Sequence, residues 1–204
     1  MNIKCLFLGY TKKETKLIRL LENKGCKVKN LSRKIKIHDT QGFNLFISFG
    51  YRYIISEKIL KKLERPLINL HMSYLPYNRG AHPVFWSFID NTPAGVSIIE
   101  VNKGIDTGPV IYQKKINFNL KKNKNLTFEN AYNKLFKEME KLFTSKVDKI
   151  ISGKYSKKKQ KGKATFYNKR DLPKELKNWK TKINNFKNKF NMKYSYKKID
   201  DIYI

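Results

Sequence analysis

Apolar and polar positions change in regular blocks along the first 120 residues. Short, nearly continuous apolar runs predict buried parallel strands, because both faces of such strands are covered. Apolar residues spaced three and four apart between these runs predict amphipathic helices. The predicted strands cover residues 3–8, 26–31, 43–49, 67–71, 96–101 and 110–116, and the predicted helices cover 15–23, 56–63 and 82–90. We therefore expect an α/β fold with an open, mostly parallel, Rossmann-like sheet and helices on both faces.

The connection between the second and third predicted strands departs from this alternation. Residues 32–42 are polar and basic, and their pattern predicts a loop. A further helix and strand would be expected there in a regular doubly wound sheet. The amino-terminal half is therefore shorter than the fold class leads us to expect.

Beyond residue 120 the pattern changes to a long helix. Apolar residues recur at steps of three or four over 126–151, and Thr127 is the expected N-cap. We expect this helix to complete a domain over residues 1–152, followed by a basic, mainly helical C-terminal extension over residues 153–204.

The extension begins with a lysine-rich loop over residues 154–163 and a predicted short strand over 164–167. Pro173 is expected to open a second amphipathic helix, because proline suits the first helical turn. One face of that helix would carry Leu176, Trp179, Ile183, Phe186 and Phe190. Such a helix could lie on an anionic membrane, but we favour a role in capping the domain or joining a dimer.

The net charge of +29 raises the question of a nucleic-acid partner. The excess is +12 over residues 1–120 and +17 over residues 121–204, so lysine is abundant throughout the chain. The accompanying Asn, Ile, Phe and Tyr indicate a compositional bias of the coding sequence. We favour this bias, together with attraction of an anionic substrate, over specific nucleic-acid recognition.

Cysteine use and hydropathy indicate the compartment. Cys5 and Cys26 lie in apolar strand-like runs without metal-ligand spacing, which is typical of small buried residues in a reducing compartment. No apolar run approaches the roughly 20 residues that span a bilayer, so we expect no transmembrane segment. The first strand begins near the N-terminus and leaves no room for a signal peptide, which predicts a cytoplasmic location.

Three polar side chains beside two of the apolar runs form a candidate catalytic group. Asn69 and His71 are two residues apart on one predicted strand and point to the same face, whereas Leu70 points to the other. Asp106 follows His71 by 35 positions, enough for one crossover helix, so a neighbouring strand end could carry it beside them. An amide can hold a developing oxyanion, an imidazole can move a proton, and a carboxylate can orient the imidazole. The trio suits attack on a carbonyl.

Each member of the trio also has a structural interpretation. Asn69 and His71 could form a polar pair at a strand end, and Asp106 could begin a turn. In combination with Leu75-Pro76 and Arg79-Gly80 the catalytic interpretation is favoured.

Residues 69–80 and 101–110 resemble the two signatures of the folate-dependent formyltransferases. Asn-x-His, Leu-Pro, Arg-Gly and Ile-Asp-Thr-Gly occur in the family's order and at its spacing. The resemblance is close over residues 47–116, looser over 1–46 and thin past residue 127, where residues 165–167 resemble a short C-terminal element of the family. It implies transfer of a formyl group from 10-formyltetrahydrofolate to an amine, without a metal. The implied catalytic residues are Asn69, His71 and Asp106.

The resemblance also implies where the pterin of the folate would lie. In the family this pocket is formed by a strand-to-helix segment, here residues 49–55, and by the loop around the aspartate. The implied cofactor-binding residues are Gly50, Tyr51, Arg52, Tyr53, Ile54, Gly104, Ile105 and Thr107. Glycine permits a tight turn and the close approach of a flat ring, although ordinary turn glycines have the same geometry.

The acceptor implied by the closest branch of the family is a nucleotide-linked amino sugar used in surface polysaccharide synthesis. Gly9 is followed by the bulky Tyr10, whereas glycinamide ribonucleotide enzymes carry a glycine-rich phosphate loop there. Residues 154–204 do not show the pattern of the β-barrel domain that methionyl-tRNA enzymes carry. The candidate substrate-binding residues are Ser73, Tyr77, Arg79, Gly80, His82 and Trp86.

Some of these candidates have a second interpretation. Tyr77, Phe85 and Trp86 could stack against a sugar or a base, or could fill the core. His82 precedes Pro83 and could equally begin a helix.

Two other functions stay open. A methionyl-tRNA formyltransferase-like enzyme predicts steep salt dependence and binding through the lysine-rich tail. A degenerate basic binding module, favoured by the short amino-terminal half, predicts that Asn69, His71 and Asp106 are dispensable. The expected partners are a small-molecule substrate and, because sugar-acting members of the family are often dimers, a second copy of the chain.

Overall fold

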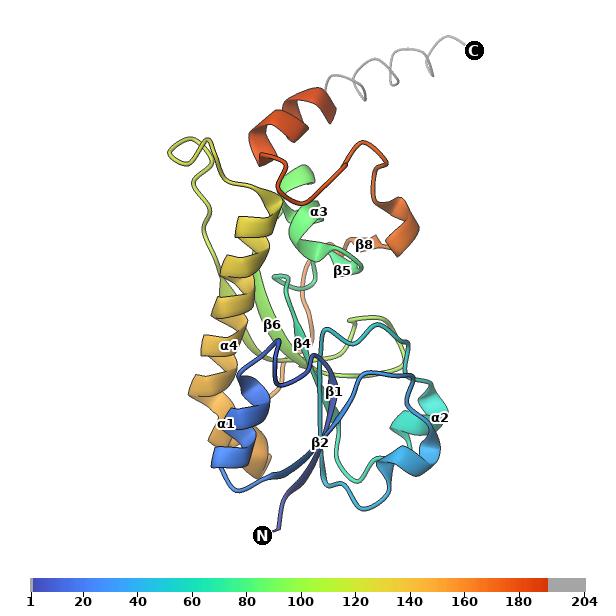
Figure 1. The fold of residues 1–204 in the computed structure, drawn as a ribbon. Coiled ribbons are helices and arrows are strands. Elements are labelled where there is room, and N and C mark those ends of the chain that lie inside the picture. The colour runs from blue at the N-terminus through green and yellow to red at the C-terminus, as the bar shows by residue number, and fades with distance from the viewer. Residues whose placement is uncertain (1, 191–204) are drawn as a thin grey trace, which may run out of the picture.

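The computed structural model describes residues 2–190, and within them six strands form one twisted sheet (Figure 1). The strand order is β2-β1-β3-β4-β6-β7. The first four of these strands run parallel to one another, whereas β6 is antiparallel to both of its neighbours, β4 and β7. Their bounds are β1 Lys4–Gly9, β2 Lys27–Leu31, β3 Leu45–Phe49, β4 Leu67–His71, β6 Gly95–Glu100 and β7 Val110–Lys115. This confirms the predicted mostly parallel α/β sheet.

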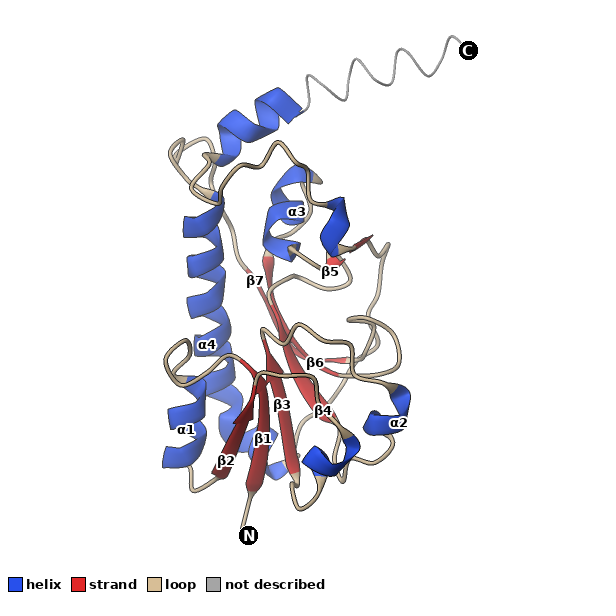
Figure 2. Cartoon of the chain, turned by 45° about the vertical axis from the view of Figure 1, so that its right-hand side comes forward, coloured by secondary structure: helices blue, strands red, loops and turns tan. Residues whose placement is uncertain are grey.

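Helices cover both faces of the sheet, as the alternation along the strands requires (Figure 2). One face carries Phe7, Leu70 and Ile98 into the larger apolar cluster, together with α1 (Leu17–Asn23), α3 (Pro83–Ile89) and α4 (Phe128–Ser152). The other face carries Leu6 and Leu67 into a smaller cluster beside α2 (Glu57–Leu60). Asn69 and His71 alternate with Leu70, so they lie on the face of the smaller cluster.

The long helix forms where its apolar stripe predicts it. Leu135, Met139 and Phe143 are fully buried along one side of α4. The Thr127 hydroxyl accepts a hydrogen bond from Asn130 N at 3.1 Å, and Gly153 ends the helix in a left-handed conformation with φ of 71°. The predicted N-cap is confirmed.

The path after β4 corrects one expectation. A crossover to a parallel neighbour was expected, but β6 runs antiparallel to β4, with Ile68 opposite Glu100 and His71 opposite Ser97. Helix α3 has seven residues and therefore rises only about 10 Å, too little to carry the chain back to the end of the sheet at which β4 begins. The chain enters β6 from the end at which β4 finishes, and residues 101–109 must fold back to reach His71.

The predicted loop over residues 32–42 contains one short 3-10 helix, η1 (Ile37–Thr40). Arg33 donates two hydrogen bonds to the Asp39 carboxylate, at 2.8 and 2.6 Å, which close this loop on itself. The Arg33 guanidinium, with help from the Lys36 backbone N–H, lowers the pKa of Asp39 to about 2.

The chain after α4 returns along the sheet and forms a second small sheet. β8 (Phe166–Tyr167) pairs in parallel with β5 (Arg79–Gly80), so the predicted strand is present over two residues. A 3-10 helix, η2 (Lys169–Asp171), follows. Residues 191–204 of the predicted extension lie outside the described residues.

The prediction of a helix that starts at Pro173 is wrong for the first half of that helix. Residues 173–182 form turns and extended chain, and helix begins at residue 183. The carbonyls of Trp179 and Thr181 accept hydrogen bonds from the first N–H groups of α4, at Glu129 (2.8 Å) and Phe128 (3.3 Å). These amides have no hydrogen-bond partner within their own helix. The carbonyls of the segment accept their hydrogen bonds and do not form a helix of their own.

Both cysteines are free and buried, as expected, and burial raises the pKa of each thiol. In the described part of the chain no helix is both long and apolar enough to span a membrane.

Candidate active site

The carboxylate of Asp106 contacts both other residues of the predicted trio, Asn69 and His71. Its Oδ1 accepts a hydrogen bond from Asn69 Nδ2 at 3.1 Å, and its Oδ2 lies 3.5 Å from His71 Nδ1. Oδ2 also accepts a hydrogen bond from Gly80 N at 2.9 Å. The structure thus places Asn69, His71 and Asp106 together, although by a folded-back loop and not by a parallel strand.

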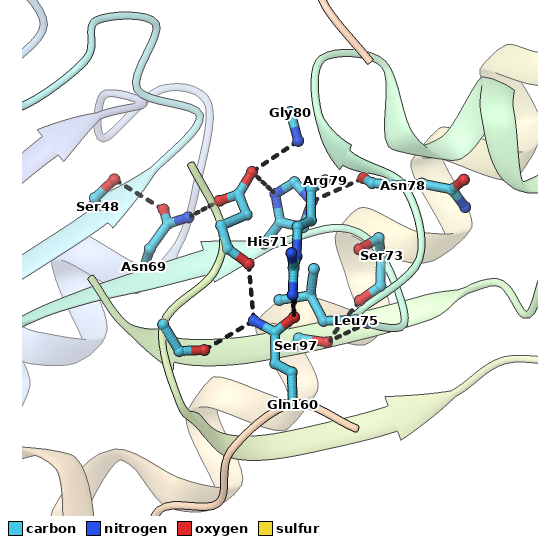
Figure 3. Close-up of polar contacts among 12 residues, drawn as sticks. Ser48, Asn69, His71, Ser73, Leu75, Asn78, Arg79, Gly80, Ser97 and Gln160 are labelled. Atoms are coloured by element: carbon cyan, nitrogen blue, oxygen red, sulfur yellow. Dashed lines mark hydrogen bonds and ion pairs between the residues drawn. The ribbon is translucent and has the colours of Figure 1, made fainter. Parts of the chain in front are cut away.

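Asn69 is oriented by the neighbouring strand. Ser48 lies opposite it in the β3–β4 register, and the Ser48 hydroxyl donates to Asn69 Oδ1 at 2.9 Å (Figure 3). Because the amide oxygen is occupied in this way, the Nδ2 donor group turns toward the carboxylate of Asp106. The amide is therefore held in one of its two orientations by a hydrogen bond at each end.

His71 is 8 % exposed and is held on both ring nitrogens. Nδ1 faces Asp106, and Nε2 lies 3.3 Å from the carbonyl oxygen of Asn78. Asn78 has a φ of 56° and is fully buried, and its N–H donates to Thr165 Oγ1 at 2.8 Å. The carbonyl that faces the imidazole is thus fixed by a residue of the C-terminal part of the chain.

Gln160 is a site residue that the sequence pattern did not single out. Its Oε1 accepts from Arg79 Nε (3.1 Å) and Nη2 (2.7 Å), and its Nε2 donates to the carbonyls of Asp106 and Gly108, both at 2.8 Å (Figure 3). It lies in a lysine-rich loop more than fifty positions after the trio, where one glutamine carries no pattern. The nearby Thr165-Phe166-Tyr167 element was the available signal.

Two of the predicted cofactor-binding residues, Gly50 and Tyr51 on the segment after β3, contact different parts of the protein. A Cβ on Gly50 would meet the ring of Tyr10 at 2.2 Å, so the flat ring against this glycine is Tyr10 itself. The Tyr51 hydroxyl accepts from Ile35 N and donates to Arg33 O, toward the 32–42 loop.

The remaining cofactor candidates lie on the segment after β3 and on the loop that carries Asp106, where they are exposed or half-buried. Tyr53, Ile54 and Ile105 are 45 %, 73 % and 41 % exposed, which is unusual for large apolar side chains, and Arg52 is exposed. The Thr107 hydroxyl donates to Asn102 Oδ1 at 2.6 Å, and Gly104 N donates to the same oxygen at 3.1 Å. The Asn102 side chain therefore shapes the loop that carries Asp106.

Only some of the predicted substrate-binding residues belong to the hydrogen-bond network around Asp106. Gly80 N and Arg79 belong to the hydrogen-bond network around Asp106. Ser73 is buried, and its hydroxyl has no hydrogen-bond partner among the described residues. Tyr77 is half-buried in the turn after β4, where its N–H donates to Tyr74 O at 3.2 Å.

Trp86 lies on α3 and His82 is the residue that caps its start, and both pack against the C-terminal part of the chain. Trp86 is 6 % exposed, and its ring is stacked on Tyr167 at 3.8 Å, which favours the core interpretation of this side chain. His82 is the N-cap residue of α3, with a φ of 52°, and its ring lies 5.5 Å from that of Trp179. Burial, followed by the charge of Lys169, lowers the pKa of His82.

In residues 2–190 no group of three or more His, Cys, Asp and Glu side chains is arranged to hold a metal ion. The site is instead built from an amide, an imidazole and a carboxylate. Such a set can donate hydrogen bonds to a developing oxyanion and move a proton.

Comparison with known proteins agrees with this chemistry. Residues 5–147 match the model of the formyl transferase family. The methionyl-tRNA formyltransferase of Thermodesulfovibrio yellowstonii is 32 % identical over 138 residues, which cover 67 % of this chain and 42 % of that protein. The chain therefore spans less than half the length of this curated relative.

Among solved structures, the formyltransferase PseJ of Anoxybacillus kamchatkensis is 33 % identical, with a TM-score of 0.82, over 89 % of this chain and 96 % of PseJ. That crystal structure is a complex with UDP-4,6-dideoxy-4-formamido-L-AltNAc and tetrahydrofolate. A sugar N-formyltransferase from a Shewanella species shares the fold, with a TM-score of 0.71, 18 % identity and coverage of 83 % of this chain and 78 % of that protein.

Proposed function

Because this chain belongs to the formyl transferase family, we propose that it transfers a formyl group from 10-formyltetrahydrofolate to the primary amine of a nucleotide-linked amino sugar. The observation that carries the proposal is the contact of one carboxylate, Asp106, with Asn69, His71 and Gly80 N. We further propose that the product serves surface polysaccharide synthesis and that the enzyme acts in the cytoplasm.

The contacts of the trio support the following roles in this proposal. 10-Formyltetrahydrofolate supplies the formyl carbon as the electrophile. We assign to the Asn69 Nδ2 group, whose orientation Ser48 holds, the donation of a hydrogen bond to the oxygen on which negative charge develops. The acceptor must attack as a neutral amine, since an ammonium has no lone pair. The new carbon–nitrogen bond forms as the bond to the departing folate nitrogen breaks.

His71 is the proposed proton carrier in this exchange. It receives a proton from the attacking amine and returns one to the departing nitrogen, because an imidazole ring nitrogen can both accept and donate a proton. Asp106 Oδ2, 3.5 Å from Nδ1, orients the ring and stabilises its charged form. After the two transfers His71 is back in its starting protonation state, and no proton is gained or lost overall.

The flat, partly apolar ring system of a folate fits the exposed apolar side chains beside the trio. Tyr53 and Ile54 lie after β3, whose neighbour β4 carries Asn69, and Ile105 precedes Asp106 directly. We propose that residues 50–54 and 104–107 hold this ring. The ring of Tyr10 already lies against Gly50, so the apolar tips of these loops are the more suitable contacts.

The amino-sugar acceptor is favoured over tRNA by the length of the match. This chain covers 96 % of PseJ, which was crystallised with a UDP-linked formamido sugar, but 42 % of the methionyl-tRNA formyltransferase. A nucleotide-linked 4-amino sugar is therefore the first acceptor to test. The positive net charge suits an acceptor that carries a diphosphate.

The test is formyl transfer from 10-formyltetrahydrofolate to a panel of nucleotide-linked amino sugars, with methionyl-tRNA included and with His71→Ala as the control. We expect turnover on one sugar that the variant lacks. Turnover on tRNA alone would overturn the acceptor. Absence of both turnover and folate binding would favour a basic module without activity.

A methionyl-tRNA formyltransferase-like activity is the second candidate, favoured by the 32 % identity to a curated enzyme of that name. It predicts that activity falls steeply with salt, since each phosphate contact releases counterions. Transfer to a nucleotide sugar, which carries few charges, should depend much less on salt.

We also propose a homodimer, which light scattering of the purified chain would reveal.

A further inference from the structure

The segment that follows α4 is fastened to the sheet before it reaches the candidate active site. In this segment, residues 154–167 and hereafter the strap, Lys157 Nζ donates to Glu100 Oε2 at 2.6 Å. Lys158 and Val110 exchange two backbone hydrogen bonds, each of 2.8 Å. The start of the strap is therefore tied to β6 and β7, on either side of the loop that carries Asp106.

The end of the strap is tied to the turn that follows β4. Thr165 O accepts from Arg79 N at 3.0 Å, and Thr165 Oγ1 accepts from Asn78 N at 2.8 Å. Ala81 N donates to Tyr167 O at 2.9 Å. Since both ends of the strap are fixed, the side chains between them hold a fixed position relative to the site.

Gln160 lies between the two anchored ends, and its amide is fully used. Its oxygen receives Nε and Nη2 of Arg79, and its nitrogen donates to the carbonyls of Asp106 and Gly108 (Figure 3). A glutamine amide offers two donors and two acceptor positions, so these four hydrogen bonds exhaust them. Gln160 therefore joins the Arg79 turn to the Asp106 loop and has no remaining group with which to bind a substrate.

The bond to Asp106 O holds an unusual backbone. Asp106 has a φ of 52°, in the left-handed region that side chains other than glycine rarely adopt. The loop also packs closely against the end of β6 at Gly108, where a Cβ would lie 1.7 Å from Glu100 O and only glycine fits. The carboxylate that faces His71 extends from this same backbone, so a rotation of the Asp106 peptide would move the carboxylate away from the imidazole.

From these contacts we infer that Gln160 is a positioning residue for formyl transfer, which acts by holding the Asp106 loop so that the carboxylate meets His71 and Asn69. The inference rests on the proposed function for its catalytic part. Its structural part, the tethering of the loop, stands on the geometry alone.

The catalytic test compares Gln160→Met, which keeps the size and removes all four hydrogen bonds, with the unaltered chain. We expect kcat to fall about tenfold while KM for both substrates changes less than about threefold, because a small misplacement of a reacting group is costly. In an Asp106→Ala background the same change should cost less than about twofold. A rise in KM with an unchanged kcat, or equal losses in both backgrounds, would overturn the inference.

Two further variants separate positioning from general damage. Gln160→Glu keeps an acceptor for Arg79 but removes the donors to Asp106 O and Gly108 O, so we expect it to lose as much kcat as Gln160→Met. Full activity of Gln160→Glu would overturn a role through Asp106. Gln113→Met is the matched control, since Gln113 donates its hydrogen bonds to Leu75 O and Ser97 Oγ, outside the Asp106 loop. Its effect on kcat should be the same with and without Asp106.

Hydrogen exchange of the full-length chain tests the tethering of the Asp106 loop without relying on formyl transfer. Failure of the tethering can therefore be told apart from failure of the proposed function. We expect backbone amides of residues 101–109 to exchange about tenfold faster in Gln160→Met than in the unaltered chain. In Gln113→Met their exchange rates should be the same as in the unaltered chain. Unchanged exchange in Gln160→Met would overturn the tethering. If the unaltered chain transfers no formyl group to any acceptor, the proposed function fails, and the exchange measurement alone decides whether Gln160 holds the loop.

Discussion

Asn69 shows how one side chain takes its role from its contacts. Its amide oxygen accepts from Ser48, and its amide nitrogen faces Asp106. Asn69→Ala removes the proposed oxyanion donor, and we expect kcat to fall on the order of a hundredfold. Steady-state formyl transfer measures this loss. Asn184→Ala, whose amide donates to Leu120 O away from the trio, is the control and should keep kcat within about twofold.

Asp39 provides a prediction on stability. It is 4 % exposed and bonded to Arg33, which holds its pKa at about 2, below the ordinary value of 3.8. A depressed pKa in the folded state stabilises the protein above pH 4, and this stabilisation is lost as pH falls from about 4 to about 2. Asp39→Asn should therefore lower the free energy of unfolding at pH 7 by about 1–2 kcal/mol, and by much less near pH 2.

Urea unfolding at several pH values measures the Asp39 contribution. Asp148→Asn is the control, because Asp148 pairs with Lys24 on the surface with 74 % of its side chain exposed. Exposed pairs contribute little, so this variant should change the free energy of unfolding by less than about 0.5 kcal/mol. Equal losses in the two variants would contradict the role of the Arg33 contact.

At the scale of elements, α4 is the support against which α1, α3 and the sheet pack. Its first turn is closed by the Thr127 hydroxyl, which accepts from Asn130 N. Thr127→Ala should lower the free energy of unfolding by about 1 kcal/mol. Ser145→Ala, on an exposed turn of the same helix, should change it by less than half of that. Chemical denaturation of both variants makes the comparison, and equal effects would refute the cap.

At the scale of the whole molecule, residues 153–190 are joined to residues 1–152 by the strap and by the stacking of Trp86 on Tyr167. These contacts predict one cooperative unfolding transition. Tryptophan fluorescence, which reports on Trp86 and Trp179, and far-ultraviolet circular dichroism should give the same midpoint. Two separate midpoints would mean that the C-terminal extension unfolds by itself. Trp179→Phe should leave the fluorescence midpoint of Trp86 in place.

Much of the fold follows from local patterns of the sequence. The strand over residues 67–71 and the helix with Thr127 as its cap form as predicted, because burial of an apolar stripe and capping depend on residues close in the chain. The helix expected from Pro173 fails in its first half because its carbonyls bond to α4, a partner about fifty positions away. Periodicity carries no information about such a partner.

The sequence by itself determined the α/β sheet, the shared face of Asn69 and His71 and the family signature around Asp106. These features depend on alternation within one strand and on residue types at short spacing. Tertiary structure alone decided that β6 runs antiparallel, that residues 101–109 fold back to bring Asp106 to His71, and that Gln160 holds that loop. These contacts join segments distant in the chain, so their geometry arises only when the sheet and the strap pack together.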